Sequence, residues 1–330
     1  MLTNIEISNY KCFKDFKLDG LSQINIFSGG NNVGKTALLE ALFIENKVVQ
    51  DDFHGFNFPL SPFIVIAKNR DIDDSKLKNY LEKIEFFATS NNIKIEIEYK
   101  TRYFLKEEEL KEMRGFSQDY NGFLVSYIDD HLYLTPLADI DTTPFSKNYI
   151  NSSKPRNQTL VELYSEIQSK GIQHKFLEYL KILDANIAWM EPQVIANELL
   201  LRITMDNPQH SLISSELGEG TNRYIEILAT LLSNSDGSVF IDEIENGIHY
   251  SKLKDIWKAI MEIVQKENIQ LFVTTHDEET IEALIKASEE LHYENISSIH
   301  LFKDKENKIV PIVRKYENFS YGVNRGADMR

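Results

Sequence analysis

Cysteine is almost absent from this chain, because Cys12 is the single one among 330 residues. One cysteine cannot form an internal disulfide, and so low a content is typical of proteins in a reducing compartment. Long apolar runs are also missing: no stretch approaches the roughly 18 consecutive apolar residues that a membrane-spanning helix needs. The N-terminal segment MLTNIEISNY lacks the apolar core of a secretory signal. These absences predict a cytoplasmic protein with no membrane contact.

Positive charge is in short supply. The chain has 36 Lys and Arg against 51 Asp and Glu, for a net charge of -15. This balance argues against a protein that binds nucleic acid over its whole surface, and it leaves DNA binding through a local basic patch open. The apolar fraction of 42% is ordinary, so 330 residues can bury the core of one large domain or two modest ones.

The two ends of the chain have the clearest periodicity, and no internal repeat or low-complexity tract separates them. Alternating apolar residues predict strands at 5–10, 13–18 and 24–27, and helical spacing begins at Thr36. The final third predicts a helix at about 222–233, a buried strand at 239–241, a helix at 253–264, a strand at 271–273 and a helix from about 278. Strands that alternate with helices in this way indicate a parallel sheet with helices on its faces.

The middle of the chain has weaker patterns. They predict strands at 94–99, 123–134 and 199–205, two helices around 160–167 and 176–183 that separate at Gly171, a charged helix or hairpin arm at 106–113, and a loop at 140–156. The tail predicts a strand pair at 299–302 and 308–313. We interpret 1–330 as a single domain, with its core in 1–46 and 205–330 and an inserted β and helical lobe in 47–204.

A glycine-rich stretch joins the third predicted strand to the helix. It fits the pattern G-x-x-x-x-G-K-[ST] from Gly29 to Thr36. Glycines let successive backbone N–H groups turn inward around phosphates, while the start of the helix adds a favourable dipole. Lys35 is then expected to reach the β- and γ-phosphates, and the Thr36 hydroxyl to ligate Mg²⁺. The predicted contact residues are Gly29, Gly30, Asn31, Asn32, Val33, Gly34, Lys35, Thr36 and Ala37. The alternative is a glycine-rich turn that matches by chance.

Two acids follow the buried strand at 239–241. Because carboxyl ends of parallel strands meet at one edge, Asp242 and Glu243 are expected beside the phosphate loop. Asp242 would hold Mg²⁺ and Glu243 would polarise the attacking water. The alternative is a solvated turn after a buried strand.

His276 follows the next strand and would place an imidazole near the terminal phosphate. A lone histidine is more often a surface or capping residue, and Asp277 is a plausible N-cap for the helix that follows.

A second glycine turn, Gly218-Glu219-Gly220, precedes the helix at 222–233. A helix start of this kind can bind an anion, although it can also be an ordinary capping turn. Since one phosphate loop is already present, this turn suggests a contact with the nucleotide of another subunit.

The order of these motifs resembles that of the ABC-type ATPases of the SMC and RecF group. More closely it resembles small bacterial AAA-family ATPases related to the overcoming-lysogenization-defect (OLD) nucleases. The matching segments are IEISNYKCFKDFKL, INIFSGGNNVGKTALLEAL, SELGEGTNRYIEILATLL, SVFIDEIENGIHYSKLKDIW and IQLFVTTHDEETIEAL. They cover about the first 45 residues and roughly 212–284.

The resemblance implies an α/β P-loop NTPase of the ABC head type. This fold has a mixed or parallel sheet with flanking helices, an N-terminal antiparallel β subregion and a helical insertion. It also implies that ATP and Mg²⁺ are sandwiched in a homodimer. The resemblance assigns the Walker A loop to Gly29, Asn32, Gly34, Lys35 and Thr36. It assigns the Walker B pair to Asp242 and Glu243, with Glu243 as general base, and the switch histidine to His276. The signature falls on Gly218–Gly220 and the two-fold interface on 246–249.

The chain departs from that pattern in several places. Gly218 stands where the signature usually has serine, so either Arg223 or Ser215 supplies the missing contact or hydrolysis is slow. The glutamine of the Mg²⁺-sensing loop has only weak candidates, which are Gln158 and 151–153. About 46 residues follow Leu284, too few for the Toprim nuclease domain of OLD proteins, so we expect a form without it. A sustained heptad pattern is absent as well.

The leading hypothesis from the sequence is an ATP-hydrolysing switch that dimerises around nucleotide and regulates a separate nuclease or toxin, in anti-phage defence or DNA maintenance. The main alternative is a RecF-like protein in repair whose ATPase gates DNA binding. A transporter subunit is disfavoured by the long insertion and the Gly-Glu-Gly signature. A small-molecule kinase is disfavoured because such kinases usually lack the signature and the switch histidine.

Overall fold

The structure is a computed structural model that describes residues 1–50, 61–70, 72, 74–90, 93–101, 105–106, 109, 122–128, 131–136, 148–206 and 211–327. Its centre is a six-stranded sheet in the order β15-β14-β3-β13-β12-β8. The strands are β3 (Ile24–Gly29), β8 (Tyr149–Ile150), β12 (Ser238–Ile241), β13 (Gln270–Thr274), β14 (Ile296–Lys303) and β15 (Ile309–Lys315). All neighbours are parallel except β14 and β15, so the sheet is mixed, which agrees with the predicted mixed or parallel sheet.

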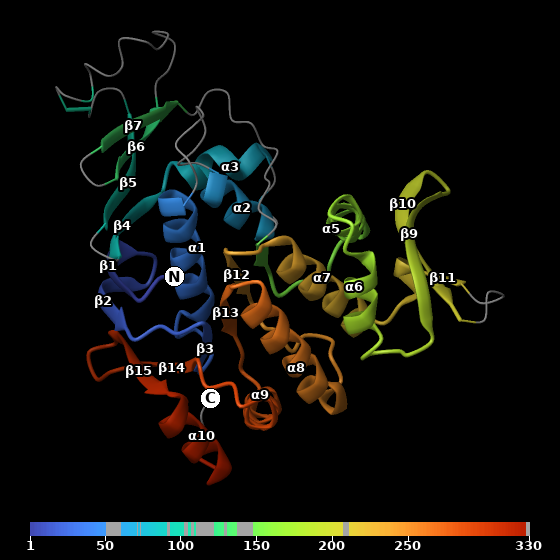
Figure 1. Ribbon diagram of the computed structural model, residues 1–330. Helices are drawn as coiled ribbons and strands as arrows, with labels where there is room; N and C mark the ends of the chain where they lie inside the picture. The colour runs from blue at the N-terminus through green and yellow to red at the C-terminus, as the bar shows by residue number, and fades with distance from the viewer. Residues whose placement is uncertain are drawn as a thin grey trace.

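Helices cover both faces of this sheet, as Figure 1 shows, and this explains why its central strands are apolar on both sides. One face packs against α1 (Lys35–Gln50) through a row of aromatic rings. In that row Phe240 stacks on Phe272 with ring centroids 5.0 Å apart and meets Phe43 of α1 edge-on at 5.6 Å. The other face packs against α7 (Glu219–Ser233), α8 (Tyr250–Lys266) and α9 (Glu278–Leu291). The carboxyl ends of three central strands are thereby held in a fixed relation to the starts of α1, α8 and α9.

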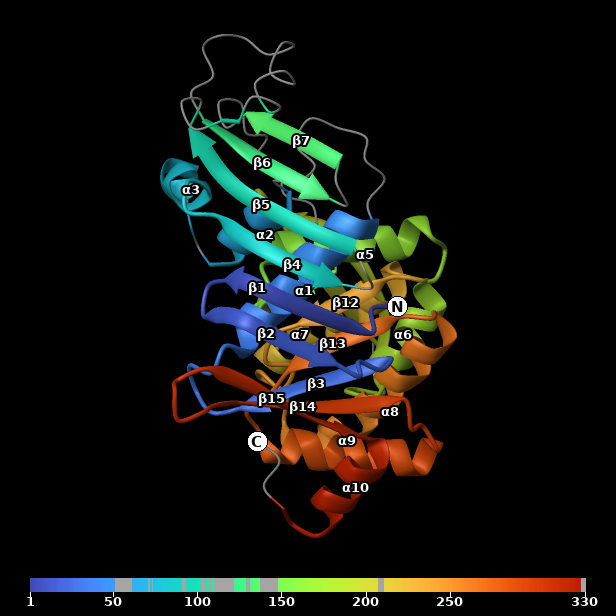
Figure 2. The ribbon, with the colours of Figure 1, turned by 90° about the vertical axis from the view of Figure 1, so that its left-hand side faces the viewer.

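A second six-stranded sheet, in the order β2-β1-β4-β5-β6-β7, is antiparallel throughout (Figure 2). Its strands are β1 (Asn4–Tyr10), β2 (Phe13–Asp19), β4 (Glu85–Ser90), β5 (Ile93–Thr101), β6 (Gly122–Ile128) and β7 (His131–Pro136). Strands β1 and β2 confirm the predicted N-terminal β subregion. Strands from the expected insertion extend it, since β4 pairs directly with β1.

The remaining described elements lie around these two sheets. Helices α2 (Ser61–Asn69) and α3 (Asp74–Leu81) pack near α1, and α10 (Tyr316–Asn324) lies against β14 and β15. Helices α5 (Asn157–Ser169) and α6 (Gln173–Leu180) pack against α7, with the predicted break at Gly171. Beyond them lies a small antiparallel sheet of β9 (Ile187–Ile195), β10 (Glu198–Met205) and β11 (Ser211–Ile213), followed by the 3-10 turn η4 (Ser214–Glu216). Within the described ranges, no helix combines the length and apolarity needed to cross a bilayer.

Several sequence predictions were wrong in detail. The single strand at 123–134 is a hairpin of β6 and β7, interrupted in sequence by Asp129 and Asp130, which favour turns. The loop at 140–156 contains the two-residue strand β8, which is too short to give a periodic signal. The helix at 222–233 begins three residues earlier, at Glu219. The charged segment 106–113 lies outside the described residues except at 106 and 109.

Candidate nucleotide site

The glycine-rich loop occupies residues 30–34, between the end of β3 and the start of α1. The backbone is left-handed at Gly29 (φ 133°), the last residue of β3, and at Asn32 (φ 58°) and Gly34 (φ 93°) within the loop. A Cβ at Gly29 would lie 2.3 Å from the Leu301 carbonyl oxygen, so only glycine fits there. A Cβ at Gly34 would lie 2.9 Å from the Cys12 sulfur. The loop is therefore a tight turn of the kind that directs successive amides toward a bound phosphate.

The predicted contact residues of this loop differ in exposure. Gly30, Asn31 and Asn32 are exposed, and Val33 is partly buried against the core. The Ala37 side chain is buried, so only its backbone N–H is suited to a ligand. The predicted contact residues 30–36 are thus exposed or partly exposed, in the turn and at the start of α1, whereas Gly29 and Ala37 at the two ends are buried.

Lys35 and Thr36 lie at the start of α1. The ammonium group of Lys35 donates to the carbonyl oxygens of Gly29 at 2.8 Å and Gly30 at 3.0 Å, which places it over the loop. Burial lowers the pKa of Lys35, and the neighbouring carboxylates of Glu243 and Asp242 oppose that shift. The Thr36 hydroxyl lies 3.2 Å from each carboxylate oxygen of Asp242.

Asp242 is the first residue after β12 and is buried. Its Oδ1 accepts a 2.6 Å hydrogen bond from the Thr274 hydroxyl, at the end of the neighbouring strand β13. Burial raises the pKa of Asp242, and the hydrogen bond from Thr274 opposes the shift. A carboxylate and a hydroxyl side by side fit Mg²⁺, which takes oxygen ligands and commonly uses one or two protein groups plus substrate phosphates. The described residues contain no cluster of three or more His, Cys, Asp or Glu that would bind a metal without such help.

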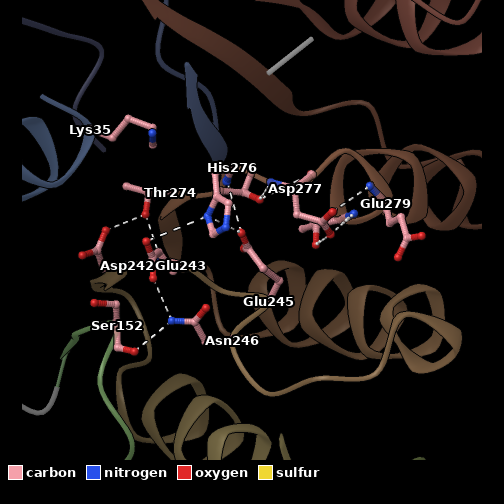
Figure 3. A network of polar contacts seen from close by, with 12 residues as sticks. Lys35, Ser152, Asp242, Glu243, Glu245, Asn246, Thr274, His276, Asp277 and Glu279 are labelled. Carbon is pink, nitrogen blue, oxygen red and sulfur yellow. Dashed lines mark hydrogen bonds and ion pairs between the residues drawn. The ribbon is translucent and has the colours of Figure 1, made fainter. Parts of the chain in front are cut away.

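Glu243 has a left-handed backbone (φ 50°), which is uncommon for a residue other than glycine and costs about 1–3 kcal/mol. Hydrogen bonds to the backbone N–H and carbonyl of Glu243 stabilise this conformation. Its N–H donates to the Thr274 hydroxyl at 2.8 Å, and its carbonyl accepts from Arg223 at 3.3 Å. Its carboxylate accepts a 2.8 Å hydrogen bond from the Asn246 side chain (Figure 3). Strain of this kind is typical of functional residues.

The prediction that Arg223 could contact a partner's nucleotide is wrong. Arg223 is 1% exposed, because its guanidinium points into the chain from α7. It donates to the carbonyls of Asn151 and Asp242, both at 2.6 Å, and pairs with Glu226 at 3.2 Å. All of these partners are internal, so Arg223 ties α7 to the ends of β8 and β12. Ser215 is exposed, and its proposed role remains a prediction.

His276 comes after β13 and lies beside the two acids (Figure 3). Its Nδ1 is 3.2 Å from Glu245 and 3.9 Å from Glu243. Asp277 is the N-cap of α9, as predicted, and accepts from the backbone of Glu279 at 3.3 Å and of Thr280 at 2.9 Å. Sequence reasoning missed Glu245, although a third acid three residues after Asp242 was a visible signal.

The signature turn has a different environment. Gly218 is the N-cap of α7, and both Gly218 and Glu219 are exposed. A Cβ at Gly220 would lie 2.1 Å from the carbonyl oxygen of Gly247, in the segment that follows Walker B. Among the described residues, the structure brings together Lys35, Thr36, Asp242, Glu243 and His276, whereas the hydrogen bonds of the Gly218–Gly220 turn do not reach them.

Of the candidates for the missing glutamine, only the segment 151–153 reaches this site. It follows β8, next to β12, and the Ser152 carbonyl accepts a 2.8 Å hydrogen bond from Asn246. Gln158 is exposed and donates instead to Glu162 on its own helix at 2.8 Å.

Comparison with known proteins places this arrangement in a family. A family model described as "AAA domain, putative AbiEii toxin, Type IV TA system" (AAA_21) matches residues 24–282. A Helicobacter pylori protein named "ATP/GTP phosphatase" is 24% identical over an alignment that covers 97% of each chain. An uncharacterized Methanocaldococcus jannaschii protein, MJECL10, is 45% identical over 42 residues, or 13% of this chain and 19% of that protein.

Solved structures show the same fold. An SMC head, crystallised bound to the C-terminal winged-helix domain of ScpA, matches with a TM-score of 0.53 and 12% identity. The match covers 96% of this chain and 98% of that one. At this identity the likeness concerns the fold alone, which is the predicted α/β fold of ATPase heads.

Proposed function

This chain belongs to the AAA_21 family of P-loop ATPases, and on that basis we propose that it is a nucleotide-operated switch. In this proposal, ATP bound by the Gly29–Thr36 loop of one copy is closed over by the Gly218–Gly220 turn of a second copy. The resulting homodimer regulates a separate effector, a nuclease or toxin, in anti-phage defence or DNA maintenance.

The contact between Thr36 and Asp242 is the observation that carries the ATPase assignment. These residues are separated by 206 positions in the chain, yet a hydroxyl and a carboxylate meet at 3.2 Å directly beside the phosphate loop. The name of the Helicobacter pylori relative, "ATP/GTP phosphatase", supports hydrolysis rather than binding alone.

Each residue of the site has a role in this reaction. Lys35 would leave the carbonyls of its own loop and bind the β- and γ-phosphates. Thr36 and Asp242 would hold Mg²⁺, which supplies charge neutralisation at the phosphates when bound. Glu243 would orient and deprotonate the attacking water, and its anchored backbone keeps the carboxylate in place. His276 would contact the terminal phosphate from the neighbouring strand.

Dimerisation is supported by the exposure of the signature turn. Gly218 and Glu219 are exposed at the start of a 15-residue helix, where backbone N–H groups are available to an anion. Gly220 packs directly on Gly247, so the turn and the segment after Walker B form one continuous surface. A second copy related by two-fold symmetry would meet the same surface.

The effector part of the proposal is supported by the family description, which includes a toxin and a toxin–antitoxin system. The resemblance of the motifs to OLD nucleases points the same way. Co-expression with the product of the adjacent gene, followed by affinity capture in the presence of ATP, tests this part directly.

The switch is tested by two substitutions. Lys35→Ala should abolish ATP binding, measured with a fluorescent ATP analogue, whereas Lys17→Ala, at an exposed lysine paired with Glu6, should leave it unchanged. Glu243→Gln should bind ATP without turning it over and accumulate as a dimer in gel filtration with ATP and Mg²⁺. A monomer under all conditions, including Glu243→Gln with ATP, would refute the dimeric mechanism.

A further inference from the structure

Glu245 contacts His276 at two groups, its backbone N–H and its imidazole ring. The side-chain Oε1 of Glu245 accepts the backbone N–H of His276 at 3.1 Å and lies 3.2 Å from the ring Nδ1 of the same residue. Both contacts come from one oxygen and are visible in Figure 3. A single carboxylate oxygen therefore holds the His276 backbone by a hydrogen bond and places negative charge beside Nδ1 of its ring.

The two residues come from adjacent strands of the core sheet. Glu245 lies in the turn after β12, and His276 lies two residues after the end of the parallel neighbour β13. The Glu245 side chain is 10% exposed, while that of His276 is 52% exposed. The carboxylate thus contacts the imidazole from the protein side, and the opposite part of the ring remains open to a ligand.

The position of this charge favours one of the two neutral forms of the ring. With a carboxylate oxygen 3.2 Å away, hydrogen on Nδ1 is favoured, because an unprotonated Nδ1 would set its lone pair against that oxygen. Within the described part of the chain Nε2 has no hydrogen-bond partner, which leaves this nitrogen available to a nucleotide phosphate or to water. Glu243 is the other acid near Nδ1, but at 3.9 Å it is beyond hydrogen-bonding distance.

We propose that Glu245 is a positioning residue for ATP hydrolysis, which orients His276 and fixes its tautomer so that Nε2 faces the reacting phosphate. This inference rests on the proposed ATPase function. It assigns to Glu245 the part that an orienting carboxylate has beside a catalytic histidine in other enzymes, where the carboxylate touches the imidazole and not the substrate.

Because Glu245 is largely buried, the ionised form of its carboxylate is unfavourable. Burial raises the pKa of Glu245, and hydrogen bonds from backbone N–H groups, including that of His276, oppose the shift. A role limited to capping the turn would need only the contact with the His276 amide. The second contact, to the ring, is the one that the proposal explains and a capping role does not.

The kinetic test is a double-mutant cycle between Glu245→Ala and His276→Gln. Glu245→Ala should lower kcat for ATP hydrolysis by about 10- to 100-fold with less than about a threefold change in KM, because a misplaced catalytic group impairs the chemical step more than binding. In the His276→Gln background the same change should have little further effect. Glu245→Gln, which keeps an acceptor oxygen, should retain more activity than Glu245→Ala. Glu45→Gln, at a buried carboxylate outside the site, is the matched control and should leave kcat unchanged.

An equal loss from Glu245→Ala in both backgrounds would overturn the proposal, because Glu245 would then act independently of His276. A readout that does not depend on activity is the ¹⁵N NMR spectrum of the histidine rings, with the His276 signal assigned by its loss in His276→Gln. The Nδ1-protonated form should predominate in the native protein and lose its predominance in Glu245→Ala. An unchanged tautomer would refute the proposal. If the native protein proves unable to hydrolyse ATP, the ATPase proposal fails, and the tautomer measurement still decides the role of Glu245.

Discussion

The contact between the signature turn and the segment after Walker B can be tested with two glycines of the same turn. Replacing Gly220 with alanine would place a Cβ 2.1 Å from the Gly247 carbonyl oxygen, 2.8 Å from its carbon and 3.1 Å from the Ile248 Cα. All three are backbone atoms and cannot rotate away as a side chain can. To reach even 3.0 Å, the start of α7 must move by about 1 Å from Gly247. Overpacking of this kind costs about 1–3 kcal/mol of unfolding free energy.

The matched control is Gly218→Ala, two residues earlier. A Cβ at Gly218 would meet nothing within 4 Å, and its φ of -61° suits any residue. The only expected cost is the poorer preference of alanine for an N-cap, which is below about 1 kcal/mol. Helix propensity alone would make Gly220→Ala stabilising, by up to about 1 kcal/mol of unfolding free energy, whereas the backbone clash makes it destabilising.

Urea unfolding followed by circular dichroism distinguishes these effects. Gly220→Ala should lower the midpoint at unchanged slope, while Gly218→Ala should stay close to the native protein. Coincident midpoints for Gly220→Ala and the native protein would show that the two turns are not in backbone contact, and the argument for one continuous dimer surface would lose its basis.

Three further results are expected. Arg223→Met should cost about 2–4 kcal/mol in urea unfolding, because the buried carbonyls that Arg223 contacts and the buried Glu226 lose their donor; a loss below 1 kcal/mol would contradict the buried network. Burial raises the pKa of Glu45 to about 7 against about 4.5 in the unfolded chain, so the folded state binds the extra proton and stability should fall as pH rises from about 4.5 to 7. Glu45→Gln should remove that part of the pH dependence, up to about 3 kcal/mol at pH 8, and parallel stability–pH curves for the two proteins would refute it. Gly29→Ala should abolish binding of a fluorescent ATP analogue, because its Cβ would meet the Leu301 carbonyl, and normal affinity would show that the loop tolerates a side chain there.

The core of the site was predictable because its signals are local. Parallel strands buried on both faces are short apolar runs, and the candidate polar residues follow them closely, with Asp242 one residue after β12 and His276 two residues after β13. The Gly29–Thr36 loop carries its own backbone requirements in its sequence. These patterns were enough to predict that 29–36, 242–243 and His276 lie at the same edge of the parallel sheet.

Other parts of the site depend on contacts that no local pattern encodes. Arg223 follows a glycine turn and was a candidate for the missing signature contact, but the packing of α7 on the ends of β8 and β12 turns it inward. Strand β8 has two residues, fewer than one period of any repeat. The pairing of Glu245 with His276 arises because β12 and β13 are neighbours in register, so it requires the sheet order and not the sequence alone.

Strand β8 links the middle segment of the chain, 47–204, to the central sheet by hydrogen bonds. The Ile150 carbonyl accepts the amide of Asp242 at 2.8 Å, and the next residue, Asn151, accepts from Arg223. Excising 47–204 would therefore remove the acceptor of the Asp242 amide at the end of β12 and one carbonyl acceptor of Arg223. Any displacement of β8 would therefore act on the backbone of Asp242 through this one hydrogen bond.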